Sequence, residues 1–197
     1  MTIAGIILAA GAGQRVGSPK ALLELDGETF FDRMAAAMQD ACDPILAVLG
    51  HHEEAVRRGV RLAGAVRFVI NPHPERGMLS SLQCGLRELP ADAAAAIFCP
   101  VDYPLVRAAT VEALAGAFRA QPETRAVVPT CEGRHGHPVL VSRQVIDELL
   151  GLRPTASPRE AIRRFRNSTV YVETGDPGVL RDVDTPADLR RLEGQDR

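Results

Sequence analysis

A glycine-rich segment near the amino terminus contains the single lysine of the chain. Lys20 ends the run Gly11-Ala-Gly13-Gln-Arg15-Val-Gly17-Ser-Pro-Lys20, whereas 22 of the 23 basic residues are arginine. Glycines let the backbone approach a ligand closely and present N–H groups to anionic oxygens. An ammonium group on a flexible stem suits contact with one phosphate, whereas guanidinium is a wide planar fork. The segment therefore indicates a phosphate-binding loop in which Arg15 and Lys20 supply positive charge.

Two familiar phosphate-binding motifs do not fit this loop. A dinucleotide fingerprint requires G-x-G-x-x-G, but the third glycine, Gly17, comes one residue late. A Walker P-loop requires G-x-x-x-x-G-K-[ST], but Ser18 and Pro19 separate Gly17 from Lys20. These mismatches argue against a P-loop NTPase, and they make an NAD-dependent oxidoreductase the least favoured alternative.

Aspartates in two later loops are candidates for a metal site. Asp102 lies between Pro100 and Pro104 after an apolar segment. A carboxylate fixed there suits Mg²⁺, which takes one or two carboxylates together with substrate phosphates. Asp182 and Asp184 lie two apart in an extended segment and therefore face the same side. We expect one of them to join Asp102, whereas capping of the helix that follows accounts for the other.

Two further segments gather side chains that carry or can take up positive charge. The first contains Arg134, His135, Gly136 and His137. No other zinc ligands lie close to its histidines in the sequence, so contact with a substrate is favoured over a zinc site. In the second segment, Arg159 and Arg163 are neighbours one turn apart on an expected helix and suit an acidic acceptor. The alternative for both segments is that they lie on the solvent-exposed surface and contact no ligand.

The order of the expected elements places these loops. Strands are expected at 3–9, 44–49, 66–70, 94–99, 125–128, 138–141 and 169–172. Helices are expected at 29–41, 52–63, 80–89, 110–120, 143–150, 158–166 and 186–192. Thr29 is the expected N-cap of the first helix, and Ser80 and Ser81 can cap the third. The alternation predicts an α/β fold with a mostly parallel sheet covered on both faces, in which ligands bind beyond the carboxyl ends of the strands.

Composition limits the class of protein. The 197 residues suffice for one domain with a substantial core, and no linker or boundary divides residues 1–197. A net charge of −2, 4% aromatic residues and the lack of Trp argue against nucleic-acid binding. The apolar stretches are too short to span a membrane, and no targeting segment is visible. Four scattered cysteines without a CxxC pair are typical of a reducing compartment, so we expect a cytoplasmic location.

Taken in order, the loops resemble those of the MobA-like nucleotidyltransferases, most closely the molybdenum-cofactor cytidylyltransferase branch. The segment Leu8-Ala-Ala-Gly-x-x-x-Arg15-x-Gly17-x-x-Lys20 is similar to the signature loop of that family. Asn71 followed by Gly77-Met-x-Ser-Ser81 is similar to its second nucleotide motif, and Asp102 stands where the family keeps a metal-binding aspartate. The segments Gly136-His-Pro-Val-Leu140 and Asp182-x-Asp184-Thr-Pro186 are similar to later motifs of the family. The resemblance covers nearly the whole chain.

The resemblance implies a single three-layer α/β/α Rossmann-like nucleotidyltransferase domain that uses Mg²⁺ and an NTP. The nucleotide contacts it implies are Leu8, Ala9, Ala10, Gly11, Gly13, Arg15, Lys20, Asn71, Ser80 and Ser81. The catalytic groups it implies are Arg15, Lys20 and Asp102. The expected acceptor contacts are Arg134, His135, Gly136, His137 and Arg159. The pair Ala10-Gly11, in place of Gly-Gly, is similar to the CTP-using branch, so CTP is the favoured donor.

The expected reaction is nucleotidyl transfer. A phosphate oxygen of the acceptor, such as molybdopterin, attacks the α-phosphorus of the NTP, and pyrophosphate leaves. Positioning and charge neutralisation then carry the rate enhancement. A molybdoenzyme or its chaperone is a further candidate partner.

Two segments depart from the family pattern. Arg153-Pro-Thr-Ala-Ser-Pro-Arg159 stands where Gly-Asp-x-Gly-Ala is common, and Pro-Val-Asp102-Tyr-Pro stands where Gly-Asp-Gln-Pro is commoner. Both lie where an acceptor is expected to bind. A sugar-1-phosphate nucleotidyltransferase and a nucleotide-binding regulator without catalysis are therefore kept as alternatives.

Overall fold

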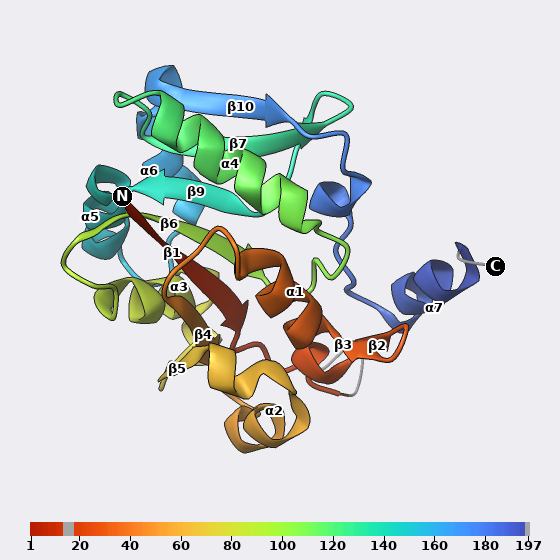
Figure 1. The fold of residues 1–197 in the computed structure, drawn as a ribbon. Coiled ribbons are helices and arrows are strands. Elements are labelled where there is room, and N and C mark those ends of the chain that lie inside the picture. Colours follow the sequence, from red (N-terminus) through yellow and green to blue (C-terminus); the bar gives the residue numbers. More distant parts are fainter. Residues whose placement is uncertain (14–17, 196–197) are drawn as a thin grey trace.

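An eight-stranded sheet runs through the centre of the structure (Figure 1), a computed structural model that describes residues 1–13 and 18–195. The order of its main strands is β10-β7-β9-β6-β1-β4-β5, and β8 pairs with β7. The strands are β1 (Thr2–Ala9), β4 (Ile45–Leu49), β5 (Arg67–Ile70), β6 (Ala93–Pro100), β7 (Ala126–Cys131), β8 (Arg134–His135), β9 (Val139–Ser142) and β10 (Thr169–Glu173).

Most neighbouring strands pair in parallel. β1 is parallel to β4 and β6, β4 to β5, and β7 to β10. β9 runs antiparallel between β6 and β7. The central strands β1 and β6 are almost entirely buried apolar runs, as expected of strands covered on both faces. Their carboxyl ends therefore lie at one edge of the sheet, where the first glycine loop and Asp102 begin.

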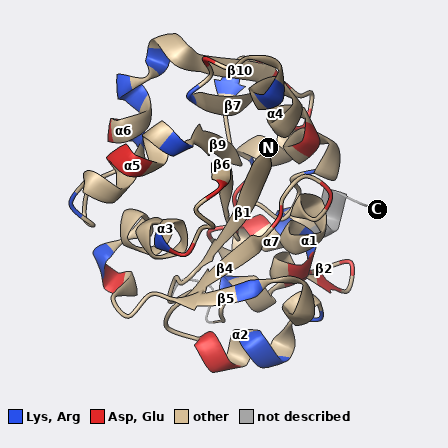
Figure 2. Ribbon diagram, turned by 60° about the vertical axis from the view of Figure 1, so that its left-hand side comes forward, with Lys and Arg blue, Asp and Glu red and all other residues tan. Residues whose placement is uncertain are grey.

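Helices cover both faces of the sheet and give three layers (Figure 1 and Figure 2). The helices on one face are α1 (Phe30–Met38), α2 (Glu53–Gly59), α4 (Ala108–Ala120) and α7 (Pro186–Gln195). Those on the other face are α3 (Met78–Arg87), α5 (Arg143–Gly151) and α6 (Pro158–Arg164). The predicted α/β/α architecture with a mostly parallel sheet is confirmed. Within the described ranges, no helix is long and apolar enough to cross a membrane.

Two helices differ from their expected bounds for reasons visible in their hydrogen bonds. The helix expected at 52–63 ends at Gly59, because the Asp32 carboxylate accepts the backbone N–H groups of Arg61 and Leu62 at 2.9 Å each. α3 begins at Met78, directly after Gly77, whose φ of 99° favours glycine. Ser80 and Ser81 therefore lie inside the first turn of α3, and the prediction that they cap it is wrong. The N-cap role of Thr29 is confirmed by its bond from Asp32 N at 3.0 Å.

Two short antiparallel pairs were not expected from the sequence. β2 (Glu24–Leu25) and β3 (Glu28–Thr29) form a separate ribbon, and β8 folds back on β7. Each turn contains two residues with positive φ, Asp26-Gly27 in the first and Glu132-Gly133 in the second. This is the geometry of tight hairpin turns, and it positions the segment that leads from β8 to His137.

Candidate active site

Lys20 lies between two carboxylates beyond the carboxyl end of the sheet. Its Nζ is 2.8 Å from Asp102 Oδ2 and 2.5 Å from Asp184 Oδ1. Lys20 begins a 3₁₀ turn (Lys20–Leu22) after the glycine loop, Asp102 follows β6, and Asp184 precedes α7. The structure thus brings together three of the residues that the sequence singled out.

The ion pairs set the charge state of this cluster. Burial raises the pKa of the Asp102 carboxyl, and the hydrogen bond from Lys20 offsets only part of that rise. Burial would lower the pKa of Lys20, but its bonds to Asp102 and Asp184 outweigh this and hold the pKa above the ordinary lysine value. Lys20 is therefore a firmly protonated cation between two acidic side chains.

Asp102 also has an oxygen that suits a metal ion. Its Oδ1 is buried and has no hydrogen-bond partner among the described residues. A buried carboxylate oxygen without a donor fits a hard cation, and Asp184 supplies a second carboxylate on the other side of Lys20. Across the described parts of the chain, no cluster of three or more His, Cys, Asp or Glu side chains forms a metal cage. Two carboxylates match Mg²⁺ or Mn²⁺ held together with substrate phosphates.

The structure distinguishes Asp184 from Asp182. Thr185 caps α7, because its Oγ1 accepts from Asp188 N at 3.2 Å while Asp188 Oδ2 accepts from Thr185 N at 2.8 Å. This reciprocal cap fixes the preceding residue, Asp184, against Lys20. Asp182 is exposed and lies close enough to raise the pKa of Asp102, but in the described residues it makes no ion pair with Lys20. Asp184 is the better candidate for the second metal ligand.

The first glycine loop is described only in part. Gly13 has a φ of 61°, and a Cβ built there would lie 2.2 Å from Ser18 O, so only glycine fits. A Cβ on Gly11 would meet no atom of the described residues within 4 Å. Leu8 and Ala10 are buried, and the His52 ring contacts Ala12 O at 3.0 Å. Ala9 is partly buried at the end of β1. The role predicted for Arg15 falls on residues 14–17, outside the described residues.

Asn71, Ser80 and Ser81 form a buried hydrogen-bonded group. Asn71 Nδ2 donates to Ser80 Oγ at 2.9 Å and to Ser81 Oγ at 3.0 Å. Asn71 Oδ1 accepts from His73 N at 2.8 Å, and Ser80 Oγ donates to Gly77 O at 2.8 Å. These contacts hold the loop before α3 in place. Direct nucleotide contact by the three side chains stays a prediction.

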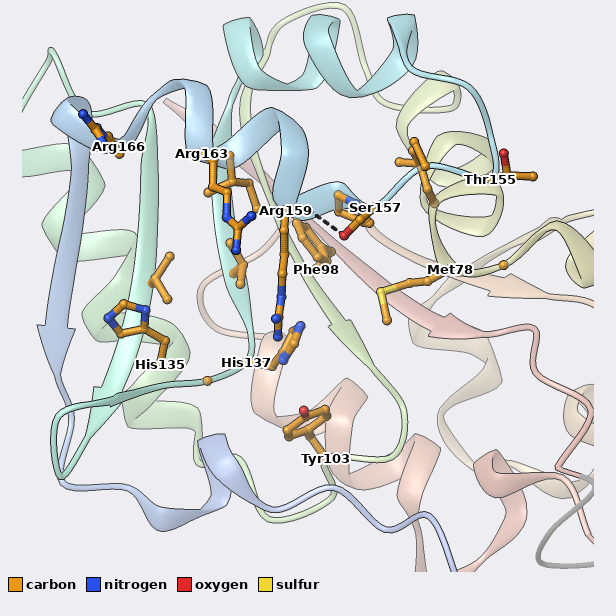
Figure 3. A pocket seen from close by; sticks show the side chains of 18 of the residues that line it. Met78, Phe98, Tyr103, His135, His137, Thr155, Ser157, Arg159, Arg163 and Arg166 are labelled. Carbon is orange, nitrogen blue, oxygen red and sulfur yellow. Dashed lines mark hydrogen bonds between the residues drawn. The ribbon is translucent and has the colours of Figure 1, made fainter.

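A cleft of about 820 Å³ lies beside α6 (Figure 3). Tyr103, the neighbour of Asp102, lines it, as do four predicted acceptor contacts: His135, Gly136, His137 and Arg159. Arg134 is not among the described residues that line the cleft, and its guanidinium lies 3.5 Å from the Glu132 carboxylate. Its predicted acceptor contact is therefore not supported by the geometry.

His137 lies on the floor of this cleft between two other rings. Its ring centroid is 4.8 Å from that of Tyr103 and 6.5 Å from that of Phe98. Burial, together with the smaller effect of the nearby Arg159 charge, lowers the pKa of His137 to about 4. Its Nδ1 is buried without a hydrogen-bond partner among the described residues. The imidazole is therefore neutral near pH 7 and presents an uncharged ring.

Sequence reasoning missed two arginines of the cleft. Arg76 lies in the loop before α3 and Arg166 lies just after α6, and both line the cleft together with Arg159 and Arg163. Neither residue stands in a recognisable motif. Their position next to α3 and α6 was the one sequence feature that could have indicated them, because both helices adjoin loops already assigned to the site.

A mostly parallel sheet between two helix layers, with a glycine loop, a lysine and two carboxylates at its carboxyl edge, is typical of α/β proteins that bind nucleotides. Residues 5–170 match the MobA-like NTP transferase domain, and the chain belongs to this family. It is 22% identical to the molybdenum cofactor cytidylyltransferase of Escherichia coli K12, over 93% of this chain and 92% of that one. It is also 31% identical to the nicotine blue oxidoreductase of Paenarthrobacter nicotinovorans, over 96% of both.

A solved structure shows the same fold. Rv0371c from Mycobacterium tuberculosis H37Rv superposes with a TM-score of 0.82 and 31% identity, covering 98% of this chain and 97% of that one. A further crystal structure of Rv0371c is a complex with manganese. Family membership confirms the resemblance seen in the sequence and makes the chain a nucleotidyltransferase.

Proposed function

We propose that the enzyme transfers a nucleoside monophosphate, with CTP as the favoured donor, onto a phosphorylated small molecule bound in the cleft, and releases pyrophosphate. The observation that carries this proposal is the contact of Lys20 with Asp102 and Asp184. Tyr103, the residue after Asp102, lines a cleft that also contains several arginines. The pair Ala10-Gly11 supports CTP over GTP. Molybdopterin is the favoured acceptor. A molybdoenzyme or its chaperone is a candidate partner that receives the product. The expected location is the cytoplasm.

The donor triphosphate binds at the glycine loop. Backbone N–H groups around Gly11 and Gly13 donate to its phosphate oxygens, as such loops do. Lys20 then leaves its two carboxylates and donates to a phosphate oxygen, which offsets the charge that builds on the departing pyrophosphate. Asp102 and Asp184 hold Mg²⁺, and this proposal is supported by the unpaired Asp102 Oδ1 and by the manganese complex of a relative. The cation supplies further neutralisation of phosphate charge when bound.

The acceptor phosphate attacks without a strong general base. A phosphate oxygen of the acceptor forms a bond to the α-phosphorus while the bond from that phosphorus to the bridging oxygen of pyrophosphate breaks. The acceptor oxygen is already anionic near neutral pH, so no proton has to be removed first. The neutral state of His137 agrees with this, since a ring with a pKa of about 4 is a poor base near pH 7.

The test is pyrophosphate release measured with CTP, GTP, ATP and UTP, each with Mg²⁺ or Mn²⁺ and with molybdopterin or one of several sugar 1-phosphates. We expect release with CTP and molybdopterin, and release at least about 100-fold slower from Asp102→Asn. Release only with a sugar 1-phosphate would favour that acceptor instead. NTP binding without release from any acceptor would support a regulator and contradict the proposal.

An oxidoreductase is a second candidate, because the nicotine blue oxidoreductase aligns over nearly the whole chain. Oxidation of NADH or NADPH by the purified protein in the presence of a dye acceptor, without NTP, tests it directly. We expect no oxidation above the rate without protein, since the glycine loop lacks the dinucleotide fingerprint.

A further inference from the structure

The cleft beside α6 contains four arginine side chains. Its lining includes Arg76, Arg159, Arg163 and Arg166, and none of the described residues that line it is an Asp or Glu. Within the described residues, none of these four guanidinium groups has a carboxylate within 4 Å, whereas Arg57, Arg58 and Arg164 each pair with a glutamate. A cleft with several uncompensated arginines suits a ligand with more than one anionic group.

Two of these arginines are spaced by one turn of α6. Arg159 and Arg163 both project from this helix into the cleft, and Arg159 extends toward His137 (Figure 3). Arg163 is the next residue on the same helix face, at about 6 Å along the helix. Because His137 packs on Tyr103, the neighbour of Asp102, Arg159 is the arginine nearer the reaction centre. Arg163 lies farther from it, on the side of His135.

Between the two ends, the floor of the cleft is made largely of aromatic and imidazole rings. Phe98, Tyr103 and the neutral His137 form one part of it. His135 and Tyr171 form a second part, with stacked rings whose centroids are 4.5 Å apart. Flat apolar surface of this kind suits a planar ring between two anionic groups.

We propose, on the basis of the function above, that the acceptor is a planar compound with two anionic groups. Its phosphate lies at Arg159, next to Tyr103, and its second anionic group lies at Arg163, one helical turn farther from the reaction centre. Arg163 is then a specificity residue that selects acceptors by a charge remote from the reacting phosphate. This role is separate from the phosphate contact that any acceptor of the enzyme needs.

Calorimetry with two matched probes tests the second anionic site. Phenyl phosphate and 4-carboxyphenyl phosphate differ only in a carboxylate on the far side of the ring. For the unaltered protein we expect the carboxylate to lower Kd about 5-fold, as a partly exposed charge-assisted bond would. In Arg163→Ala the two Kd values become equal while that of phenyl phosphate hardly changes, and in Arg163→Lys part of the gain returns.

Two further variants complete the comparison. Arg159→Ala is expected to weaken both probes to the same extent and keep the ratio of their Kd values. Arg164→Ala is the matched control, because Arg164 lies on the same helix but pairs with Glu148 at 2.6 Å, and it should leave both Kd values unchanged. The inference is overturned when the carboxylate brings no gain in the unaltered protein, or when the gain survives in Arg163→Ala. No NTP is present in these measurements, so the outcome is independent of whether pyrophosphate is released.

Discussion

Replacement of Lys20 by methionine separates the two roles that the structure gives to this side chain. Lys20 is bonded to Asp102 and Asp184 before substrates bind, and in the proposed reaction it moves to the phosphates. Lys20→Met removes the charge but keeps a similar length. We expect kcat for pyrophosphate release to fall about 100-fold, or about 2.7 kcal/mol, the size found when one electrostatic donor is lost.

The same change should strengthen metal binding in the absence of nucleotide. Unit charges 4 Å apart interact by about 4 kcal/mol in a partly buried site. Lys20 and Asp102 are each only 20% exposed, but Asp184 is 45% exposed, so solvent screening reduces the effect. We expect the Kd for Mn²⁺ to drop about 10-fold, equal to about 1.4 kcal/mol.

Electron paramagnetic resonance of free Mn²⁺ measures this Kd, and a coupled pyrophosphatase assay with CTP and the acceptor found by the screen measures kcat. Lys20→Arg is the control, since it keeps the charge and should leave Mn²⁺ binding nearly unchanged while kcat still falls. A Lys20→Met enzyme with near-normal kcat, or with weaker Mn²⁺ binding, would refute the reasoning.

Three other changes test separate parts of the site. Asp102→Asn should lower kcat at least about 100-fold while calorimetry still detects CTP binding. If the variant also lost CTP binding, the assignment of Asp102 to the metal would be contradicted. In Gly13→Ala the alanine must adopt a φ of 61° with its Cβ 2.2 Å from Ser18 O, so we expect a strain of about 1–3 kcal/mol. This strain should lower Tm and raise KM for CTP. An unchanged Tm and KM would show that the loop has another conformation. The pKa of His137 is lowered to about 4, so its contribution to stability is complete above about pH 6.5 and is lost as the pH falls toward 4. Denaturant unfolding at pH 7 and pH 4.5 should show a loss of about 2–3 kcal/mol that is absent in His137→Asn, and equal losses in both proteins would contradict it.

The sequence predicted the central strands because continuous apolar runs leave few other solutions. β1 and β6 are such runs, and the loops that follow them contain Lys20 and Asp102. Since parallel strands end at one edge of a sheet, the meeting of these two side chains followed from the topology. The β2–β3 ribbon was missed because strands of two residues show no periodicity.

Other parts of the site depend on tertiary contacts that no local pattern encodes. The choice between Asp182 and Asp184 depends on the reciprocal cap of Thr185 and Asp188, which fixes the direction of the chain before α7. Arg76 joins the arginines of α6 only through the packing of α3 and α5 against the same face of the sheet. Charge alone did not distinguish Arg163, which lines the cleft, from Arg164, which pairs with Glu148.

The central claim is that Lys20, Asp102 and Asp184 surround the phosphates of a bound nucleotide. An anomalous difference map from a crystal grown with Mn²⁺ and a non-hydrolysable CTP analogue tests it most directly. We expect a manganese peak bonded to Asp102 and Asp184, with Lys20 Nζ moved onto a phosphate oxygen. A nucleotide bound elsewhere, with Lys20 still bridging the two carboxylates, would contradict it.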